Sequence, residues 1–360
     1  HIDKADDVAS DTSKDKTLGK DKGKKGKGKD SLQEKPNYGK IILDGTLRFL
    51  MMLRNASLSY SAGNGTAMPG FMYAPNIMGL NWTNGAPGFL FVFGGQTDIR
   101  HISSERGWLS TDTLMNYAYQ ENHNQVINFR ATVEPFKDFR IDVTANRNQS
   151  SSYSEYYRAD GEGNFHSYTP KTTGNYNITQ FGLGKFFTDG DKLFEDFKAV
   201  RYELATRLSE LNPNSGGVIN DPPGYPVGYG RLSQDVLTSA FLCAYAGKNS
   251  STVDVTSPFP KLPLPNWRLN YTGFTKIKGV QKVFQSLSLT HAYTCTYNIG
   301  NYATNLLYTA DANGNPTAFD QMDNFVPNRE IGQITISEQL NPLIGFDMTL
   351  KNSLMIKVEY

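Results

Sequence analysis

Residues 125–148 read QVINFRATVEPFKDFRIDVTANRN, and this stretch decides the predicted fold of the chain. On either side of the turn PFKD, apolar side chains alternate with polar or charged ones. Such alternation is typical of a β-strand with one face in an apolar environment and the other in water. The stretch therefore predicts an antiparallel hairpin with one apolar face and one polar face.

The two faces of this hairpin can be assigned residue by residue, because successive side chains of a strand point to opposite sides of a sheet. We expect the apolar face to carry Ile127, Phe129, Val133, Phe139, Ile141 and Val143. We expect the polar face to carry Asn128, Arg130, Thr132, Glu134, Arg140, Asp142 and Thr144. Two charged residues on the polar face of each strand suit contact with water.

Similar alternation recurs along the rest of the chain and predicts about eleven strands in all. Strands are expected from residue 55 onward and around Phe89–Phe93, while residues 47–54 have helical spacing after Asp44, a candidate N-cap, and fit a strand nearly as well. Further strands are predicted at 175–186, 266–274, 284–299, 301–309, 331–338, 343–350 and 353–360. The run at 284–299 is much longer than the roughly 5–6 residues typical of a soluble strand.

Two helices are predicted inside one large insertion. Residues 189–213 carry an apolar stripe at helical spacing, with Asp189 or Asp191 as the candidate N-cap. Residues 233–247 begin with the candidate N-cap Ser233. A stretch rich in Pro and Gly separates them. The expected organisation is a Lys/Gly-rich disordered or loop segment at 1–37, strands and loops at 38–186, the insertion at 187–265, and strands again at 266–360.

The composition favours strands and turns over helices and is compatible with strands that cross a membrane. Aromatic residues make up 12% of the 360 residues, charged residues 20%, and mean hydropathy is −0.47. No apolar run reaches the roughly 18 residues of a transmembrane helix, whereas a barrel strand needs only about 9–11 alternating residues. A net charge of +1 argues against a nucleic-acid binder. The predicted fold class is all-β: an antiparallel transmembrane β-barrel segment with helix-containing loop insertions.

No residue pattern predicts an enzyme, a cofactor site or a metal site. The chain has no nucleophile elbow, phosphate-binding loop or paired-cysteine motif, and its five His are scattered. The loops DGEG at 160–163 and DANGN at 311–315 favour plain turns over calcium loops. Cys243 and Cys295 are expected to be unpaired. We therefore predict no catalytic residue, no cofactor and no metal.

Several stretches, in order from about residue 40 to 360, resemble one protein family. The most specific are VEPFKDFRIDVTA at 133–145 and PFPKLPLPNWR at 258–268, supported by GYGRLSQDVLTSAFLCAYAGK at 228–248, LSLTHAYTCTYNIGNYATNLLY at 287–308 and ISEQLNPLIGFDMTLKNSLMIKVEY at 336–360. These stretches are similar to the SprA/Sov family of Bacteroidota, the outer-membrane translocon of the type IX secretion system. Residues 1–37 carry none of the resemblance.

The resemblance implies a bacterial outer-membrane protein that exports folded cargo bearing a C-terminal signal domain. It implies a very large single-chain barrel, near the upper limit of about 36 strands, of which this sequence would be a C-terminal portion. The implied partners are a FadL-like outer-membrane protein of the PorV type, a periplasmic plug protein, the cargo, the lipid membrane and the remaining strands of the same barrel. No nucleic acid is implied.

In this interpretation the polar hairpin set lines the pore and the apolar set faces lipid. One alternative is an outer-membrane barrel for small solutes, of the FadL-like or TonB-dependent type, which predicts a complete barrel in one chain of this size. Another is a soluble β-sandwich, in which the apolar strand faces pack on each other.

Overall fold

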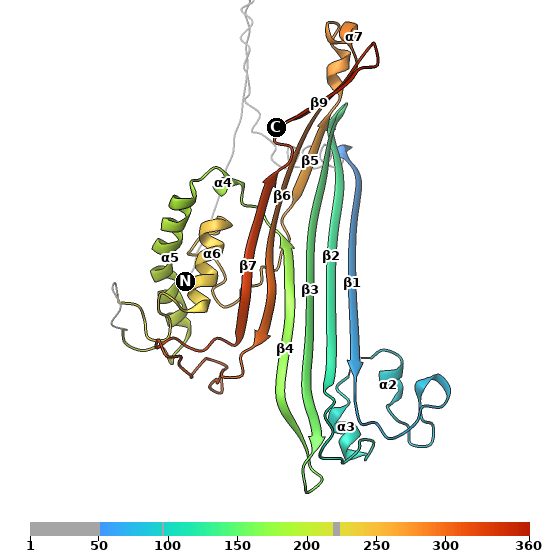
Figure 1. The fold of residues 1–360 in the computed structure, drawn as a ribbon, viewed down its shortest axis with the longest axis vertical. Coiled ribbons are helices and arrows are strands. Elements are labelled where there is room, and N and C mark those ends of the chain that lie inside the picture. The colour runs from blue at the N-terminus through green and yellow to red at the C-terminus, as the bar shows by residue number, and fades with distance from the viewer. Residues whose placement is uncertain (1–50, 96, 219–223) are drawn as a thin grey trace, which may run out of the picture. The chain divides into compact units, whose positions relative to one another are not determined.

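The computed structural model describes residues 51–95, 97–218 and 224–360, which form one nine-stranded antiparallel sheet with helices beside it (Figure 1). The predicted segment 1–37 lies outside the described residues. The strands are β1 Leu53–Ala67, β2 Tyr119–Phe136, β3 Phe139–Ala159, β4 Phe165–Thr179, β5 Asn266–Tyr271, β6 Phe284–Thr304, β7 Arg329–Leu340, β8 Gly345–Leu350 and β9 Met355–Glu359. The sheet is open in the described chain, with β1 as its outer strand on one side and β7 and β9 as its outer strands on the other.

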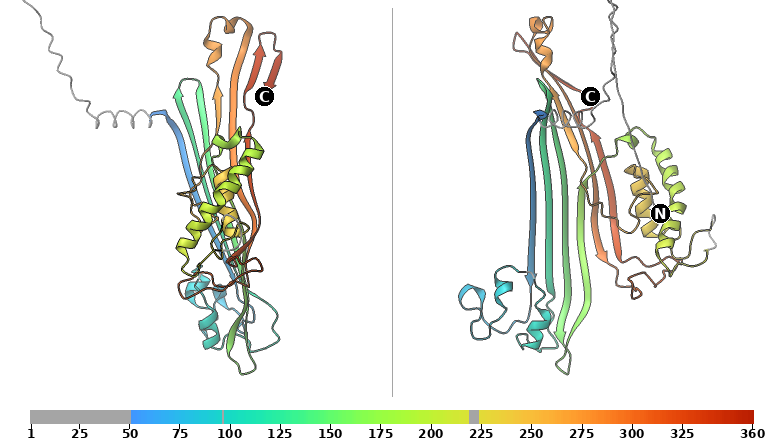
Figure 2. Two further views of the ribbon diagram at one scale, coloured as in Figure 1. Left: turned by 90° about the vertical axis from the view of Figure 1, so that its left-hand side faces the viewer. Right: turned by 180° about the vertical axis from the view of Figure 1, so that it is seen from behind.

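The nine strands occupy seven positions in an up-and-down meander. β4 and β5 both pair with β3 and β6, at different heights, so they form one interrupted position. β7 and β8 likewise share one side of β6. Figure 2 shows the long strands side by side from two further directions. Each position is antiparallel to its neighbour.

The two ends of the sheet differ in the length of their connections. At the end formed by the β2–β3 turn, strands are joined by residues 137–138, 272–283 and 351–354; we call this the short-loop end. The 272–283 connection holds η2 (Gly273–Lys276) and α7 (Val280–Val283). At the opposite, long-loop end the connections are 68–118, 160–164 and 305–328. The first contains η1 (Ile77–Gly79), α2 (Phe89–Val92) and α3 (Arg100–Glu105).

The insertion leaves the sheet halfway along the β4/β5 position. It contains α4 (Leu183–Phe186), α5 (Gly190–Leu211) and α6 (Gln234–Tyr245). The Asp189 carboxylate caps α5 by accepting from the Asp191 N–H at 2.9 Å, as the N-cap prediction requires. Ser233 precedes α6 but makes no side-chain cap bond. The insertion returns to the sheet where the Leu264 N–H donates to the Thr179 carbonyl.

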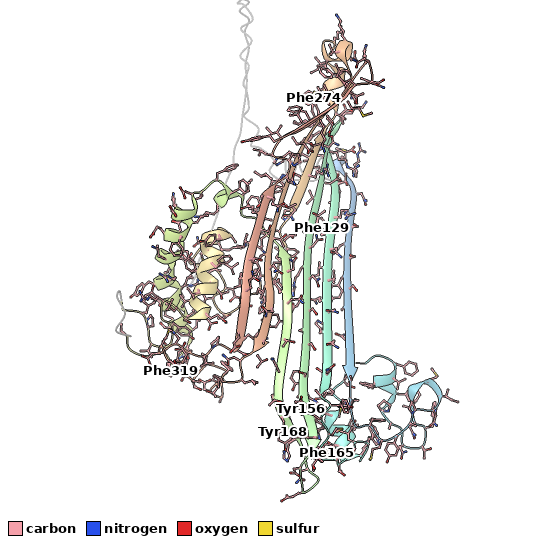
Figure 3. The ribbon with its side chains drawn as sticks, in the orientation of Figure 1. Phe129, Tyr156, Phe165, Tyr168, Phe274 and Phe319 are labelled. Atoms are coloured by element: carbon pink, nitrogen blue, oxygen red, sulfur yellow. The ribbon has the colours of Figure 1, made fainter. Side chains whose placement is uncertain are left out.

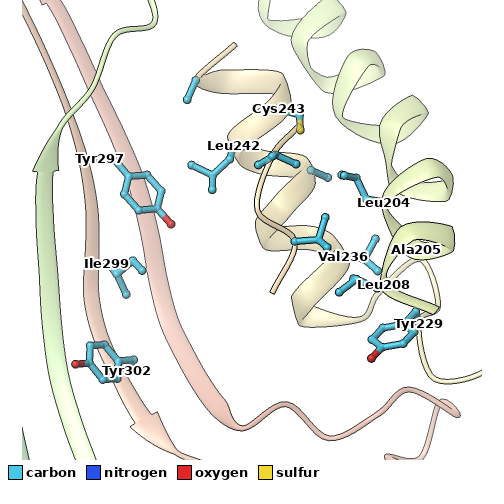
Figure 4. Packing of buried hydrophobic residues seen from close by; sticks show 14 of the residues in the cluster. Leu204, Ala205, Leu208, Tyr229, Val236, Leu242, Cys243, Tyr297, Ile299 and Tyr302 are labelled. Carbon is cyan, nitrogen blue, oxygen red and sulfur yellow. The ribbon is translucent and has the colours of Figure 1, made fainter. Parts of the chain in front are cut away.

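α6 packs on one face of the sheet, and α5 packs on α6 (Figure 4). Val236, Ala240 and Cys243 recur every three or four residues along α6 and are buried, which is the spacing of one helical face. They belong to a single core with Leu204 of α5 and Tyr297 of β6.

The Pro-rich segment 258–265, through which the insertion returns to β5, crosses the face of the sheet on which α6 packs. The Tyr297 hydroxyl donates to the Pro258 carbonyl at 2.9 Å, and the Tyr176 hydroxyl donates to the Pro260 carbonyl. Two tyrosine hydroxyls of the sheet thus satisfy carbonyl groups of this segment. Gly174 leaves room for the Tyr302 ring, which a side chain at that position would overlap.

Four strand predictions were wrong in type or extent. Phe89–Phe93 contains the short helix α2, not a strand. β4 ends at Thr179, so 180–186 is loop and α4 instead of strand. The predicted strands 284–299 and 301–309 are one strand, β6, which continues through a register shift near Gly300 and ends at Thr304. The described residues therefore hold nine strands where about eleven were expected.

No helix in the described ranges combines the length and the apolar character needed to cross a bilayer.

Candidate functional site

The polar face of the sheet is continuous across its strands. Residues paired across two strands point to the same side of a sheet, so the register assigns whole rows of side chains. One row runs Ser59–Asn128–Asn146 across β1, β2 and β3, and another runs Thr179–Thr296–Ser337 across β4, β6 and β7. A third runs Asn148–Asn177–Asn298–Thr335. Hydroxyl and amide groups make up these three rows.

The predicted polar set of the β2–β3 hairpin lies together on this face. Arg130 pairs with Thr144 and Thr132 pairs with Asp142 across the two strands. The Thr132 hydroxyl donates to Asp142 at 2.7 Å, and Arg140 binds the same carboxylate through two of its nitrogens at 2.8–3.1 Å. Glu134 is ion-paired with Arg54 at 2.8 Å.

The polar face is hollowed in this region. A hollow of about 640 Å³ is lined by the hairpin residues Arg130, Thr132, Arg140, Asp142 and Thr144, and from β5 and β6 by Asn266, Arg268 and Thr294. A second hollow of about 470 Å³ adjoins it along Ser57, Ser59, Asn128 and Asn146. Arg268 was absent from the predicted set, although its alternation with Trp267 and Leu269 marks it as polar-face. Only the pairing of β5 with β3, which brings Arg268 opposite Asp142, reveals its place.

The predicted apolar set lies on the opposite face. Val133 pairs with Ile141, and Phe129 pairs with Ala145. β1 extends this face with Leu58, opposite Phe129, and Tyr60, opposite Ile127. Leu58 is 71% exposed, and Phe129 lies in the middle of the strands (Figure 3). Over β1 to β3, we call this surface the uncovered apolar band.

Aromatic rings border the band at the short-loop end. Phe136 and Phe139 stack at 4.8 Å between ring centroids, and Tyr271 contacts both edge-on. Phe274 packs on Tyr271 at 4.8 Å. Towards the long-loop end the same face of β3 turns polar at Arg147, Gln149 and Ser151. The apolar surface is thus limited to a strip across the strands.

On β4, β6 and β7 the apolar face is covered by the insertion. Tyr176, Ile178, Tyr297 and Ile299 are 0% exposed, and Ile331, Ile334 and Ile336 of β7 pack against the same core. We call this surface the helix-covered apolar face. It continues the rows of the uncovered band, since Arg147 of β3 pairs with Ile178, and Ile178 pairs with Tyr297.

A buried ion pair fixes α3 to the long-loop end of β3. The Glu155 side chain is fully buried and bonds Arg100, Tyr153 and Ser167. Arg100 also binds Asp98 at 2.7 Å and lies over the Tyr119 ring. Because the carboxylate is paired and hydrogen-bonded, its burial is compensated. This cluster is structural, since its groups bond one another.

The insertion holds a smaller hollow of about 320 Å³ between α5, α6 and residues 308–331. Asp235, in the first turn of α6, lines it without an ion-pair or hydrogen-bond partner among the described residues. Burial raises the pKa of this carboxyl to about 6. Burial likewise raises the pKa of the Cys243 thiol to about 11, which disfavours its reactive thiolate form.

The two loops that resemble calcium sites are turns closed on their own backbone. Asp160 accepts the Glu162 and Asn164 N–H groups at 2.8 and 2.9 Å, and Asp311 accepts the Asn313 and Asn315 N–H groups at 2.9 Å. Such bonds are those of Asx turns. Across the described residues, no group of three or more His, Cys, Asp or Glu is arranged to hold a metal ion.

No protein-family model matches the chain, and no curated protein matches it.

Proposed function

We propose that this chain forms part of the wall of a large outer-membrane β-barrel that conducts folded proteins, the translocon of the type IX secretion system. In this proposal the polar face lines the lumen and the uncovered apolar band faces lipid. The observation that carries it is the two-faced register, in which a continuous polar face backs an exposed apolar band. An exposed apolar surface in contact with water would be unfavourable, whereas lipid satisfies it.

The dimensions of the band support this placement. From Ile127 to Phe136 the strand has ten residues, within the roughly 9–11 that a tilted barrel strand needs to cross the bilayer. The lipid-facing band of outer-membrane barrels is about 25 Å tall, with aromatic residues at its borders. The rings of Phe136, Phe139, Tyr271 and Phe274 stand at one border, and Tyr60 stands at the other.

The open sheet supports a shared barrel. In lipid, each unpaired backbone group costs several kcal/mol, so a spanning sheet must close. Among the described residues β1, β7 and β9 each have an edge without a partner strand, so the proposal requires further strands beside them. In the proposal, which follows the resemblance to the SprA/Sov family, these are other strands of one very large barrel. The loop lengths of the described sheet also orient it in the membrane. Outer-membrane barrels carry short periplasmic turns and long extracellular loops, so in this proposal the short-loop end faces the periplasm.

The chemistry of the polar face suits the passage of varied cargo. It is rich in hydroxyl and amide groups, and Asp142 and Glu134 are both paired with arginines. A surface without a large apolar patch offers little to retain a folded protein. The driving force for export, the FadL-like partner and the periplasmic plug lie outside this chain.

The test is the mass and composition of the native particle extracted from outer membranes in mild detergent. We expect a particle far heavier than the 40.1 kDa of this sequence, containing further strand-rich polypeptide and a FadL-like protein. A lone, heat-modifiable 40 kDa barrel would contradict the proposal and would favour a small-solute transporter. Recovery of the chain in the soluble fraction would contradict both and favour the soluble sandwich.

A further inference from the structure

The larger hollow of the polar face gathers three guanidinium groups around one carboxylate. Arg130, Arg140 and Arg268 line it together with Asp142, from β2, β3 and β5. Thr132, Asp142 and Arg268 form one row across these strands, and Arg130 with Thr144 forms the next. Three positive charges and one negative charge leave the hollow with a net charge of +2 (3 − 1).

The single carboxylate is hydrogen-bonded by two neighbours, and its charge also attracts Arg130. Asp142 accepts hydrogen bonds from Arg140 and from the Thr132 hydroxyl. Across the described residues, no hydrogen bond or ion pair joins Arg130 or Arg268 to a carboxylate. Two guanidinium groups therefore remain exposed in the same hollow with their donors free.

Neighbouring charges do not neutralise this pair. Glu134 is bound to Arg54 at 2.8 Å, and on β9 Glu359 is bound to Lys357 at 2.7 Å. Asp347 lies opposite Lys357 across β8 and β9. Like charges held in one concave surface repel each other and raise the local concentration of counter-ions. An anionic group that sits between Arg130 and Arg268 relieves this repulsion.

We propose that this hollow binds carboxylate groups of the polypeptide that passes along the polar face. The inference rests on the proposed function, because it takes the polar face as the lumen. A guanidinium group matches a carboxylate in planar, two-point hydrogen bonding, and acidic side chains are the carboxylates that a protein cargo presents.

The position of the hollow argues against a lipid phosphate as its occupant. Arg130 stands between Phe129 and Ala131 of the apolar strip, at the depth of the band but on the opposite face. Lipid headgroups lie at the borders of such a band, so they do not reach this depth. A polypeptide in the lumen does. Because the arginines are exposed and the contact is open to water, binding is weak and reversible, as conduction requires.

The experiment measures the binding of a fluorescein-labelled peptide of alternating Asp and Ser to the full-length native protein in detergent at low ionic strength. The test variant is Arg130→Gln/Arg268→Gln. The matched control is Lys278→Gln/Lys282→Gln, which removes the same charge from exposed positions in the β5–β6 connection. A peptide of alternating Lys and Ser serves as the charge-reversed probe. Fluorescence anisotropy gives the dissociation constant of each pair.

We expect the Asp–Ser peptide to bind the wild type and the control with the same affinity. It should bind the Arg130→Gln/Arg268→Gln protein about tenfold more weakly, because roughly one charge-assisted hydrogen-bonded pair is lost. The Lys–Ser peptide should not bind. Equal binding to wild type and the arginine variant, or no binding to the wild type, would overturn the inference. Arginine-dependent binding of lipopolysaccharide without binding of the Asp–Ser peptide would also overturn it.

This result is separable from the proposed function. Arginine-dependent peptide binding by a protein that proves to be soluble would retain the site and reject its place in a lumen. A membrane-spanning barrel that binds no acidic peptide would retain the translocon and reject the site.

Discussion

The uncovered apolar band and the helix-covered apolar face belong to the same side of one sheet but have different surroundings. On β1 that side is exposed, with Leu58 keeping 71% of its surface accessible, and on β2 and β3 its apolar residues are half-buried. On β4, β6 and β7 the same side lies beneath α6, and Tyr297 and Ile299 are fully buried. Strand alternation is equal in both regions. What differs is the partner of the apolar side chains, which is protein in one region and, in our proposal, lipid in the other.

The largest expected effect is a difference between the two regions in how much a leucine-to-alanine substitution lowers the stability of the protein. Leu204→Ala removes a side chain that is 0% exposed within the core of α5, α6 and the sheet. We expect it to cost about 3–5 kcal/mol, from lost apolar burial and a residual cavity. Leu58→Ala, the matched control in the uncovered band, should cost less than about 1 kcal/mol in detergent, because its surroundings are fluid. Thermal unfolding of the two variants beside wild type measures the difference.

Equal losses at the two sites would break the comparison. A large loss at Leu58 would mean that protein, not lipid or detergent, packs against the band in the native particle. A negligible loss at Leu204 would mean that the insertion contributes little to the folded sheet.

A smaller effect on stability is expected from the partly buried carboxylate of Asp235 in α6. Burial raises the pKa of Asp235 from 3.8 to about 6. An acid with a raised folded-state pKa binds more protons when folded, so stability is greatest at low pH and falls as pH rises from about 4 to about 6. Asp235→Asn removes this cost. A shift of two pKa units corresponds to about 3 kcal/mol. The expected effect on stability is smaller, because the side chain is only partly buried and stands in the first turn of α6, where an anion is favoured.

We therefore expect Asp235→Asn to stabilise the protein by about 1 kcal/mol at pH 8, and the gain to vanish near pH 4. Unfolding temperatures of the variant and wild type across this pH range measure it. A matched change at exposed Asp191 of α5 should give no stabilisation at pH 8. A gain that persists unchanged at pH 4 would show that the effect is not one of charge burial.

The hairpin at the centre of the fold was predictable because its signal is local. β2 and β3 are joined by a two-residue connection, and the alternation on either side fixes which residues share a face. The same holds for β8 and β9, and for the helix α5 with its Asp189 cap. In each case a few neighbouring residues contain all the information.

The errors arise where pairing partners are far apart in sequence. The run at Phe89–Phe93 is apolar enough for a strand, but no strand is available to pair with it, and it forms α2. β4 stops at Thr179 because β5, 87 residues later at Asn266 (266 − 179), takes over its position beside β3. No local pattern marks that exchange. The replacement of β4 by β5 also forms the larger hollow of the polar face, since it brings Arg268 beside Asp142.

The covering of β4, β6 and β7 could not be predicted either. Tyr297 and Ile299 on β6 alternate with Thr296 and Asn298 as Ile127 and Phe129 alternate with Asn128 on β2. Both patterns fit a strand with one apolar face. Which part of the apolar face is covered by helices depends on where the insertion leaves the sheet, and this is set by tertiary packing.

The central claim is that the two faces of the β2–β3 hairpin meet lipid and water respectively. Single-cysteine labelling in intact outer membranes tests it most directly, and the buried Cys243 and Cys295 give little background. We predict that Arg130→Cys and Asp142→Cys react with a water-soluble, membrane-impermeant maleimide. We predict that Ile127→Cys and Ile141→Cys react only with a lipid-soluble one. Equal labelling of the four positions by the water-soluble reagent, or the reverse pattern, would contradict the account.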